Sequence, residues 1–216
     1  NSKVKHRIIL VLGDGGARAS AHLGVLEVLV DHSLVPNCLV GTGFGAYIAA
    51  AYAAVPSIEK VKTFYNSLPS KYFFEPNYTN AVGLYTVDAL IEAWFEFTKC
   101  YKFESLQIPL SIVISELISG TSHVIRNGDI LLALRKTLAW PGIYTVVLEQ
   151  NEIFCAGAET NPLPLDVGRS MSPDVLIASD TESQHKRTYP TRSSTLSPWL
   201  NALTQVLPPI KWFKRQ

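Results

Sequence analysis

The sequence predicts a three-layer α/β/α domain with a mostly parallel central sheet. Short apolar runs alternate along the chain with segments of helical periodicity, which is the pattern of repeated β-α units. The chain has 216 residues, of which 47% are hydrophobic and 17% are charged. It is therefore long and apolar enough to bury a core, and we expect one soluble globular domain.

The first β-α unit lies near the N-terminus. The apolar run Ile8–Leu12 predicts a buried strand, and the glycine-rich residues 13–16 predict a tight turn after it. Apolar side chains then recur at helical spacing at Leu23, Leu26 and Val30. Because the basic residues before Ile8 lead directly into this strand, we expect a strand entry here and not a signal peptide.

The same order repeats further along the chain. Cys38–Val40 predicts a second strand, residues 41–45 a second glycine turn, and Ala46–Ala54 a helix of small residues that ends before Pro56. The later elements follow from the same periodicities. They are a strand at 108–116, a helix at 130–138, a hairpin formed by 144–147 and 153–155 around Gln150-Asn151, and a strand at 174–179.

Residues 56–103 are unusually rich in aromatic side chains. We interpret this stretch as helices and loops that pack over the sheet and contribute mainly to the core, with a ligand pocket as the alternative.

The composition changes near the C-terminus, so we divide the chain into a domain at 1–185 and a C-terminal segment at 186–216. That segment begins as a linker without acidic residues, and Ser197-Pro198 then opens a predicted amphipathic helix. Residues 210–216 combine aromatic and basic side chains, a composition suited to an anionic membrane surface. The alternative is that the helix packs on the sheet.

Charge and cysteine usage exclude several classes of function. The net charge is +1, and residues 8–185 carry 10 basic and 18 acidic side chains, so we expect no nucleic-acid partner. Cys38, Cys100 and Cys155 are odd in number and far apart in sequence, which argues against disulfides and a zinc site. No apolar run is long enough to span a membrane. We expect a cytoplasmic or peripheral membrane protein without a cofactor or metal.

Three glycine-containing blocks carry the functional information. They read LGDGGARASAHLGVL at 12–26, GTGFGA at 41–46 and AGAETNPLP at 156–164. In order and spacing they resemble the patatin-like phospholipase family, whose blocks are a G-G-G-x-R-G loop, a G-x-S-x-G nucleophile elbow and a D-G-[GA] segment leading into N-x-L-P. Segments 103–110, 137–144 and 174–178 extend the resemblance, which covers about residues 8–180.

The resemblance implies a lipid acyl hydrolase fold with a Ser-Asp dyad and gives each block a role. Gly43 stands at the nucleophile position, Ala156 at the base position, and Gly15, Gly16, Ala17 and Arg18 in the oxyanion loop. The physical chemistry of the blocks agrees, because a strand that turns sharply into a helix exposes the residue at the turn. A glycine loop also presents backbone N–H groups to a developing oxyanion.

The sequence departs from this pattern at the positions that matter. Gly43 has no hydroxyl group and Ala156 has no carboxylate, so both members of the dyad are missing. Asp14 and Ala19 replace glycines of the loop, and we expect an aspartate at the mouth of an anion hole to repel negative charge. Four departures together favour a naturally degenerate member over an engineered knockout.

Nearby side chains offer little replacement for the dyad. Thr42 belongs to the end of a strand, Ser20 to the first helix, and Glu159 would have no nucleophile to deprotonate. We interpret His22 as a buried, hydrogen-bonded structural histidine.

The sequence therefore favours a pseudoenzyme that binds a lipid or acyl ligand, or a partner. The alternatives are an active or deliberately inactivated phospholipase of the Ser-Asp type, and a structural interaction module without a ligand. The oligomeric state does not follow from the sequence.

Overall fold

The computed structural model describes residues 6–79 and 82–181. A seven-stranded mixed sheet forms its centre, and in it β5, β2, β1 and β9 run parallel in that order. Strands β6 and β8 pair antiparallel with β5, and β7 pairs antiparallel with β8. The strands are β1 (Ile8–Leu12), β2 (Cys38–Thr42), β5 (Leu110–Glu116), β6 (Ser122–Ile125), β7 (Val147–Glu149), β8 (Glu152–Ala156) and β9 (Val175–Ser179).

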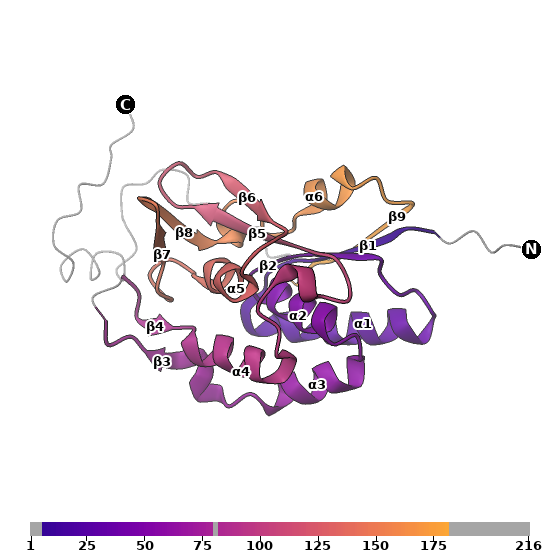
Figure 1. The fold of residues 1–216 in the computed structure, drawn as a ribbon, viewed down its shortest axis with the longest axis horizontal. Coiled ribbons are helices and arrows are strands. Elements are labelled where there is room, and N and C mark those ends of the chain that lie inside the picture. The colour runs from indigo at the N-terminus through magenta and orange to yellow at the C-terminus, as the bar shows by residue number, and fades with distance from the viewer. Residues whose placement is uncertain (1–5, 80–81, 182–216) are drawn as a thin grey trace, which may run out of the picture. The chain divides into compact units, whose positions relative to one another are not determined.

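Alternating side chains of the central strands divide the core into two layers. Leu10, Leu12 and Leu39 pack on one face with α1 (Ala21–Asp31), α2 (Gly43–Ala54), α3 (Ile58–Ser67), α4 (Asp88–Thr98) and α5 (Ile130–Leu138). Ile9, Val11 and Val40 point to the opposite face, which α6 (Leu165–Ser170) covers. Figure 1 shows α1–α4 on one side of the sheet and α6 on the other. The predicted three-layer fold with a mostly parallel sheet is confirmed.

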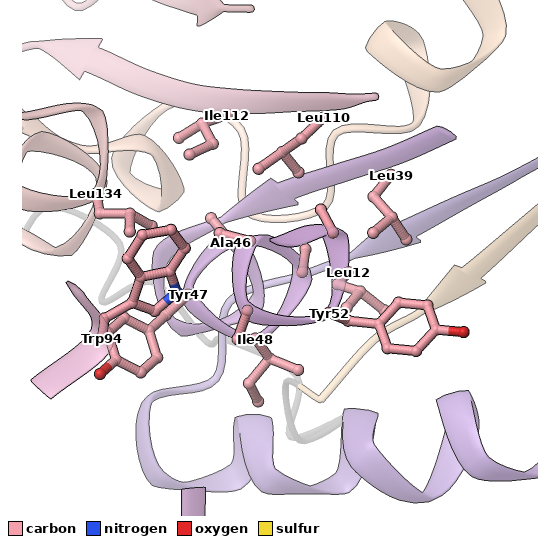
Figure 2. Packing of buried hydrophobic residues seen from close by; sticks show 14 of the residues in the cluster. Leu12, Leu39, Ala46, Tyr47, Ile48, Tyr52, Trp94, Leu110, Ile112 and Leu134 are labelled. Carbon is pink, nitrogen blue, oxygen red and sulfur yellow. The ribbon is translucent and has the colours of Figure 1, made fainter. Parts of the chain in front are cut away.

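Helix α2 lies at the centre of the larger core layer (Figure 2), and all its residues from Gly43 to Ala53 are buried. Small side chains allow this close packing. A Cβ atom at Gly41 on β2 would lie 2.5 Å from Ala46 Cα, and one at Gly45 would lie 2.3 Å from the Gly13 carbonyl oxygen. The N-terminus of α2 is therefore pressed directly against the ends of β1 and β2.

The aromatic stretch folds as helices and short strands below the sheet. Besides α3 and α4 it contains the 3-10 helix η2 (Ser70–Phe74) and the two-stranded hairpin β3 (Glu75–Pro76) and β4 (Tyr85–Thr86). Trp94 is fully buried, whereas Phe74 and Tyr78 are exposed. Most of these rings therefore belong to the core or its edge. A shallow, open groove of about 420 Å³ lies between α3 and α4 and includes Phe64 and Phe97 in its lining.

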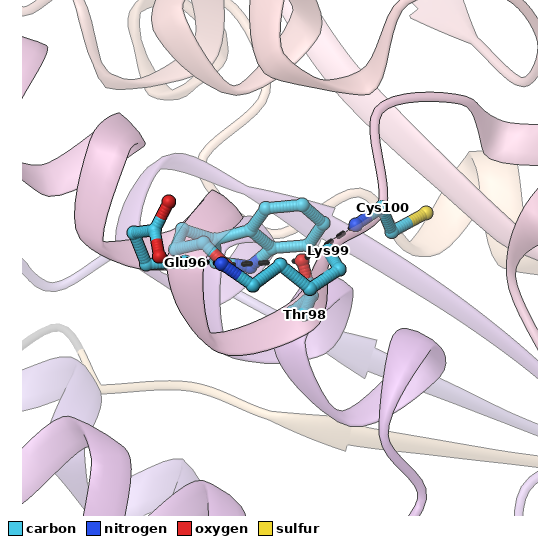
Figure 3. A network of polar contacts seen from close by, with 5 residues as sticks. Glu96, Thr98, Lys99 and Cys100 are labelled. Atoms are coloured by element: carbon cyan, nitrogen blue, oxygen red, sulfur yellow. Dashed lines mark hydrogen bonds and ion pairs between the residues drawn. The ribbon is translucent and has the colours of Figure 1, made fainter.

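Helix α4 ends where Lys99 adopts a left-handed backbone conformation with φ of 52°. The Thr98 hydroxyl donates to the Trp94 carbonyl and accepts the Cys100 N–H, and Lys99 pairs with Glu96 (Figure 3). The Lys99 N–H donates to the Phe95 carbonyl at 2.7 Å and so satisfies one of the carbonyl groups that the last turn of a helix leaves without a partner.

Three 3-10 helices complete the described elements, and the structure differs from the sequence-based expectations in detail. The 3-10 helices are η1 (Gly16–Ser20), η3 (Phe103–Ser105) and η4 (Gly157–Glu159). The hairpin at Gln150-Asn151 is formed by β7 and β8, so its first strand starts at Val147 and not at Tyr144. Strand β6 was not predicted. The boundary at 185, the C-terminal helix and the basic aromatic tail lie outside the described residues.

Candidate functional site

The turn from β2 into α2 has the geometry of a nucleophile elbow. Thr42 ends the strand with φ −137° and ψ 147°, and Gly43 opens the helix with φ 54°, a left-handed conformation that is strained for residues with a side chain. The Gly43 N–H donates to Thr137 Oγ1 at 2.9 Å, and the Thr137 hydroxyl donates to the Val113 carbonyl at 2.7 Å. Thr137 thus fixes the elbow to β5.

Ala156 lies at the end of β8, close to this turn. Thr42 pairs with Val113 and Ala156 pairs with Ile114, so β2 and β8 end beside consecutive residues of β5. A Cβ atom at Gly157 would lie 2.5 Å from Thr42 Oγ1. The positions to which the sequence assigned a nucleophile and a base are therefore neighbours at one edge of the sheet, and they carry neither a hydroxyl nor a carboxylate.

The glycine loop after β1 directs N–H groups toward the same turn, and Asp14 accepts them. The Gly15 and Gly16 N–H groups donate to Asp14 Oδ1 at 2.7 and 3.3 Å, and the Phe44 N–H donates to the same oxygen at 3.1 Å. The expectation that Asp14 would merely repel an anion from the mouth of the hole is therefore incomplete, because its carboxylate lies among the donors. Ala17 and Arg18 are exposed on η1.

Hydrogen bonds to two later segments of the chain anchor this loop. The Gly13 N–H donates to the Ser179 carbonyl at 3.0 Å, and the Asp14 N–H donates to the Pro162 carbonyl at 3.0 Å. The Thr181 hydroxyl donates to the Asp14 carbonyl at 2.9 Å. The position of Asp14 is thus set by the end of β9 and by the segment between η4 and α6.

His22 is fully buried beneath the loop. Its Nε2 lies 2.8 Å from the Gly13 carbonyl and its Nδ1 lies 2.8 Å from Ser179 Oγ. Since a carbonyl oxygen only accepts, Nε2 carries the hydrogen and the neutral ring accepts the Ser179 hydroxyl at Nδ1. Burial lowers the pKa of His22 and keeps the ring neutral. These contacts agree with a structural histidine that ties the ends of β1 and β9 together.

The replacement candidates for the dyad lie in unsuitable places. Thr42 is fully buried, and Ser20 is exposed and donates to the Ala17 carbonyl. Glu159 is exposed on η4. The thiol of Cys155, next to Ala156, is buried, and burial raises its pKa to about 12, so it remains protonated at neutral pH.

Two residues of the site were missed from the sequence. Thr137 belongs to a segment that carried the family resemblance, but its hydroxyl had no assigned role. Ser179 looked like the last residue of an ordinary strand. Both act through contacts between distant segments, which no local sequence pattern reveals.

Exposed apolar side chains lie on a loop that is hydrogen-bonded to the base position and on a hairpin that is hydrogen-bonded to this loop. Trp140 is 55% exposed and follows Ala139, whose carbonyl accepts the Ala156 N–H at 3.0 Å. Ile143 lies in the same loop, and its carbonyl accepts the N–H of Tyr85 on β4. We call the exposed apolar residues of this loop, of the C-terminal end of η2 and of the β3–β4 hairpin the apolar rim. It comprises Phe74, Tyr78, Val82, Leu84, Trp140 and Ile143.

Neither a metal site nor a membrane span is found in residues 6–79 and 82–181. No group of three or more His, Cys, Asp or Glu side chains in these ranges could hold a metal ion. No helix in the same ranges combines the length and the apolar character that crossing a bilayer requires.

Comparisons with known proteins agree with the geometry. The family model described as patatin-like phospholipase matches residues 10–168. Mouse patatin-like phospholipase domain-containing protein 6 is 28% identical over 201 residues, which cover 89% of this chain and 15% of that protein. An uncharacterised NTE family protein of Mycobacterium tuberculosis is 25% identical over 203 residues, 92% of this chain and 56% of the relative.

The fold also matches a solved structure. The crystal structure of VipD from Legionella pneumophila superposes with a TM-score of 0.55 at 11% identity, over 70% of this chain and 46% of VipD. This chain therefore spans only part of the length of these proteins.

Proposed function

Because this chain belongs to the patatin-like phospholipase family, we propose that it uses a lipid acyl hydrolase scaffold to bind an acyl lipid without hydrolysing it. The observation that carries the proposal is the elbow itself. Gly43 occupies the apex with no hydroxyl, and Ala156 beside it has no carboxylate.

Acyl transfer by this type of site needs a nucleophile and a base that act as a unit. Loss of one member already removes most of the rate advantage, and loss of both leaves no group to attack the ester carbonyl. The buried, protonated Cys155 and the buried Thr42 do not replace the nucleophile. The scaffold is thus better suited to holding an acyl group than to cleaving it.

The apolar rim supports a lipid as the ligand. Its exposed side chains belong to segments that are hydrogen-bonded to each other and, through Ala139, to the base position. Aromatic rings such as those of Trp140 and Phe74 favour the interface between lipid headgroups and acyl chains. We infer peripheral attachment to a lipid surface, with the rim facing the lipid and the elbow behind it.

Three assays test the proposal. We expect no hydrolysis of p-nitrophenyl acyl esters or phospholipid vesicles above a buffer control, and no labelling by a fluorophosphonate serine probe. We also expect the protein to co-sediment with zwitterionic phosphatidylcholine vesicles at physiological salt, which offer the basic tail no charge attraction.

The variants Trp140→Asp and Phe74→Asp should weaken vesicle binding, whereas the matched control Val28→Asp, at an exposed apolar position on α1, should leave it unchanged. Turnover that the serine probe blocks would instead indicate an active phospholipase with replacement residues. Equal vesicle binding by all three variants would contradict the role of the rim.

A further inference from the structure

The carboxylate of Asp14 joins two segments that are 30 residues apart. On its own loop, Asp14 Oδ1 accepts the N–H groups of Gly15 and Gly16. Across the site, the same oxygen accepts the Phe44 N–H at 3.1 Å, in the first turn of α2. The carboxylate thus lies where the glycine loop and the start of the helix meet.

These three donors are the groups that an acyl hydrolase site would offer to an oxyanion. The N–H that follows the elbow residue and the N–H groups of a facing glycine loop converge on developing negative charge. The helix dipole of α2 adds a partial positive charge at the same place. A carboxylate oxygen is the chemical equivalent of that oxyanion, so Asp14 satisfies the donors from within the chain.

The same carboxylate also fills the space of a side chain at the elbow. A Cβ atom at Gly43 would lie 2.3 Å from Asp14 Cγ and 2.4 and 2.6 Å from its two oxygens. Gly120 also has a left-handed backbone, with φ 67°, but a Cβ atom there would have no atom within 4 Å. The crowding at Gly43 is therefore not a general property of left-handed glycines in this fold. A side chain at position 43 and the Asp14 carboxylate in its present position therefore exclude each other.

We propose that Asp14 is an internal anion that occupies the oxyanion hole and closes it to the carbonyl group of any acyl ligand. The proposal rests on the proposed function in one respect, because it takes the turn from β2 into α2 as the acyl-binding site. An acyl lipid bound by this chain is then held by apolar contacts and not by the N–H groups of Gly15, Gly16 and Phe44. The double change Gly43→Ser and Ala156→Asp, made with Asp14 retained, would bring the new side chain at position 43 into collision with the carboxylate and would not by itself rebuild the site.

A double-mutant cycle tests whether positions 14 and 43 are coupled. Gly43→Ala is compared with the matched control Gly120→Ala, which introduces the same methyl group at a similar φ but into open space. Both changes are made in the unmodified chain and in Asp14→Ala, which lacks the carboxylate.

In the unmodified chain we expect Gly43→Ala to lower the Tm by about 4 °C or more beyond Gly120→Ala. In the Asp14→Ala background the two substitutions should lower it about equally. Equal losses in both backgrounds would overturn the proposal.

A chemical-rescue experiment tests the anion itself. Formate matches the group that Asp14→Ala removes, so it should raise the Tm of this variant more than chloride does at equal ionic strength, and should shift the amide resonances of Gly15, Gly16 and Phe44. The unmodified chain and the control Asp31→Ala should respond to both salts alike. Absence of a formate-specific effect on Asp14→Ala would contradict the internal anion.

If Asp14→Ala does not fold, amide hydrogen exchange in the unmodified chain replaces these tests. Protection of Gly15 and Gly16 supports the proposal, and exchange of both amides at the rate of an unstructured peptide overturns it. None of these measurements uses a lipid, so their failure is distinguishable from a failure of lipid binding.

Discussion

Gly45→Ala should strongly destabilise the fold, because Gly45 sets the distance between α2 and β1. Its missing side chain lets the first turn of α2 touch the end of the strand. A Cβ atom there would lie 2.3 Å from the Gly13 carbonyl oxygen and 2.6 Å from that of Leu12. Both contacts are with backbone atoms, and the Gly13 N–H is itself bonded to β9, so neither can move without disturbing the sheet.

The magnitude follows from the space that the methyl group needs. Ordinary contact begins at 3.4 Å, so the helix and the strand would have to separate by roughly 1 Å. Overpacking of this kind lowers the free energy of unfolding by about 1–3 kcal/mol, and by more where the backbone must shift. The better helix propensity of alanine offsets about 1 kcal/mol of this loss. We expect a net loss of about 2 kcal/mol, or a fall in Tm of about 4–8 °C for a domain of this size.

Gly24→Ala is the matched control, because Gly24 lies on α1 with no atom within 4 Å of a Cβ position. Alanine there should raise the free energy of unfolding by about 0.5–1 kcal/mol. Urea and thermal unfolding followed by circular dichroism measure both variants. A Gly45→Ala protein as stable as the unmodified chain would refute the close-approach reasoning.

Three further predictions concern acid stability and the C-terminal tail. Burial lowers the pKa of His22, so as the pH falls below about 6.5 the unfolded chain binds a proton there before the folded chain does. The free energy of unfolding should therefore decrease in that range by at most about 1.4 kcal/mol per pH unit. His22→Gln should flatten this dependence in unfolding measurements from pH 7 to 5. Hydrogen bonds from the Ser119 hydroxyl and backbone N–H lower the pKa of Glu116 to about 2. The ionised carboxylate therefore stabilises the fold fully above about pH 4.5, and this contribution is lost as the pH falls toward 2. Glu116→Gln should be less stable than the unmodified chain at pH 6, and its stability should change less between pH 4.5 and 2. Truncation after Pro209 should remove most co-sedimentation with anionic vesicles at low salt and leave the Tm nearly unchanged. A clear fall in Tm on truncation would instead indicate a structural role for these residues.

The sequence predicted β1, β2 and β5 well because these three parallel strands are buried on both faces. Ile8–Leu12 is a continuous apolar run, and the structure has β1 at these residues. Strand β6 gave no such signal, since Ser122 and His123 are polar and exposed and the strand forms only by pairing with β5. Tyr144 has a strand-forming side chain, yet it lies in a turn beside β4 and only bridges to Tyr85.

The candidate site was predictable as a set of positions but not as a set of contacts. Glycine turns after apolar runs pointed to Gly43 and the loop at residues 13–16, because glycine marks positions where the backbone needs a conformation that other residues rarely adopt. The partners of these residues are remote. The Phe44 N–H donates to Asp14 and the Gly43 N–H donates to Thr137, in each case between segments far apart in the sequence, so the roles of Asp14 and Thr137 depend on packing that local periodicity does not encode.

If the chain descends from an active acyl hydrolase, as the proposed function implies, the contacts of Asp14 constrain the order in which positions 14 and 43 changed. With any side chain at position 43, the present carboxylate position is blocked by contacts of 2.3–2.6 Å, so the change to glycine must precede the entry of Asp14 into the hole. Once the elbow is glycine, the N–H groups of Gly15, Gly16 and Phe44 would face a vacated space, and unsatisfied donors are costly when they are partly buried. The Asp14 carboxylate satisfies all three. On the proposed function, a chain in this state has a stabilised hole in place of a catalytic one, and we expect activity to return only with changes at positions 14, 43 and 156 together.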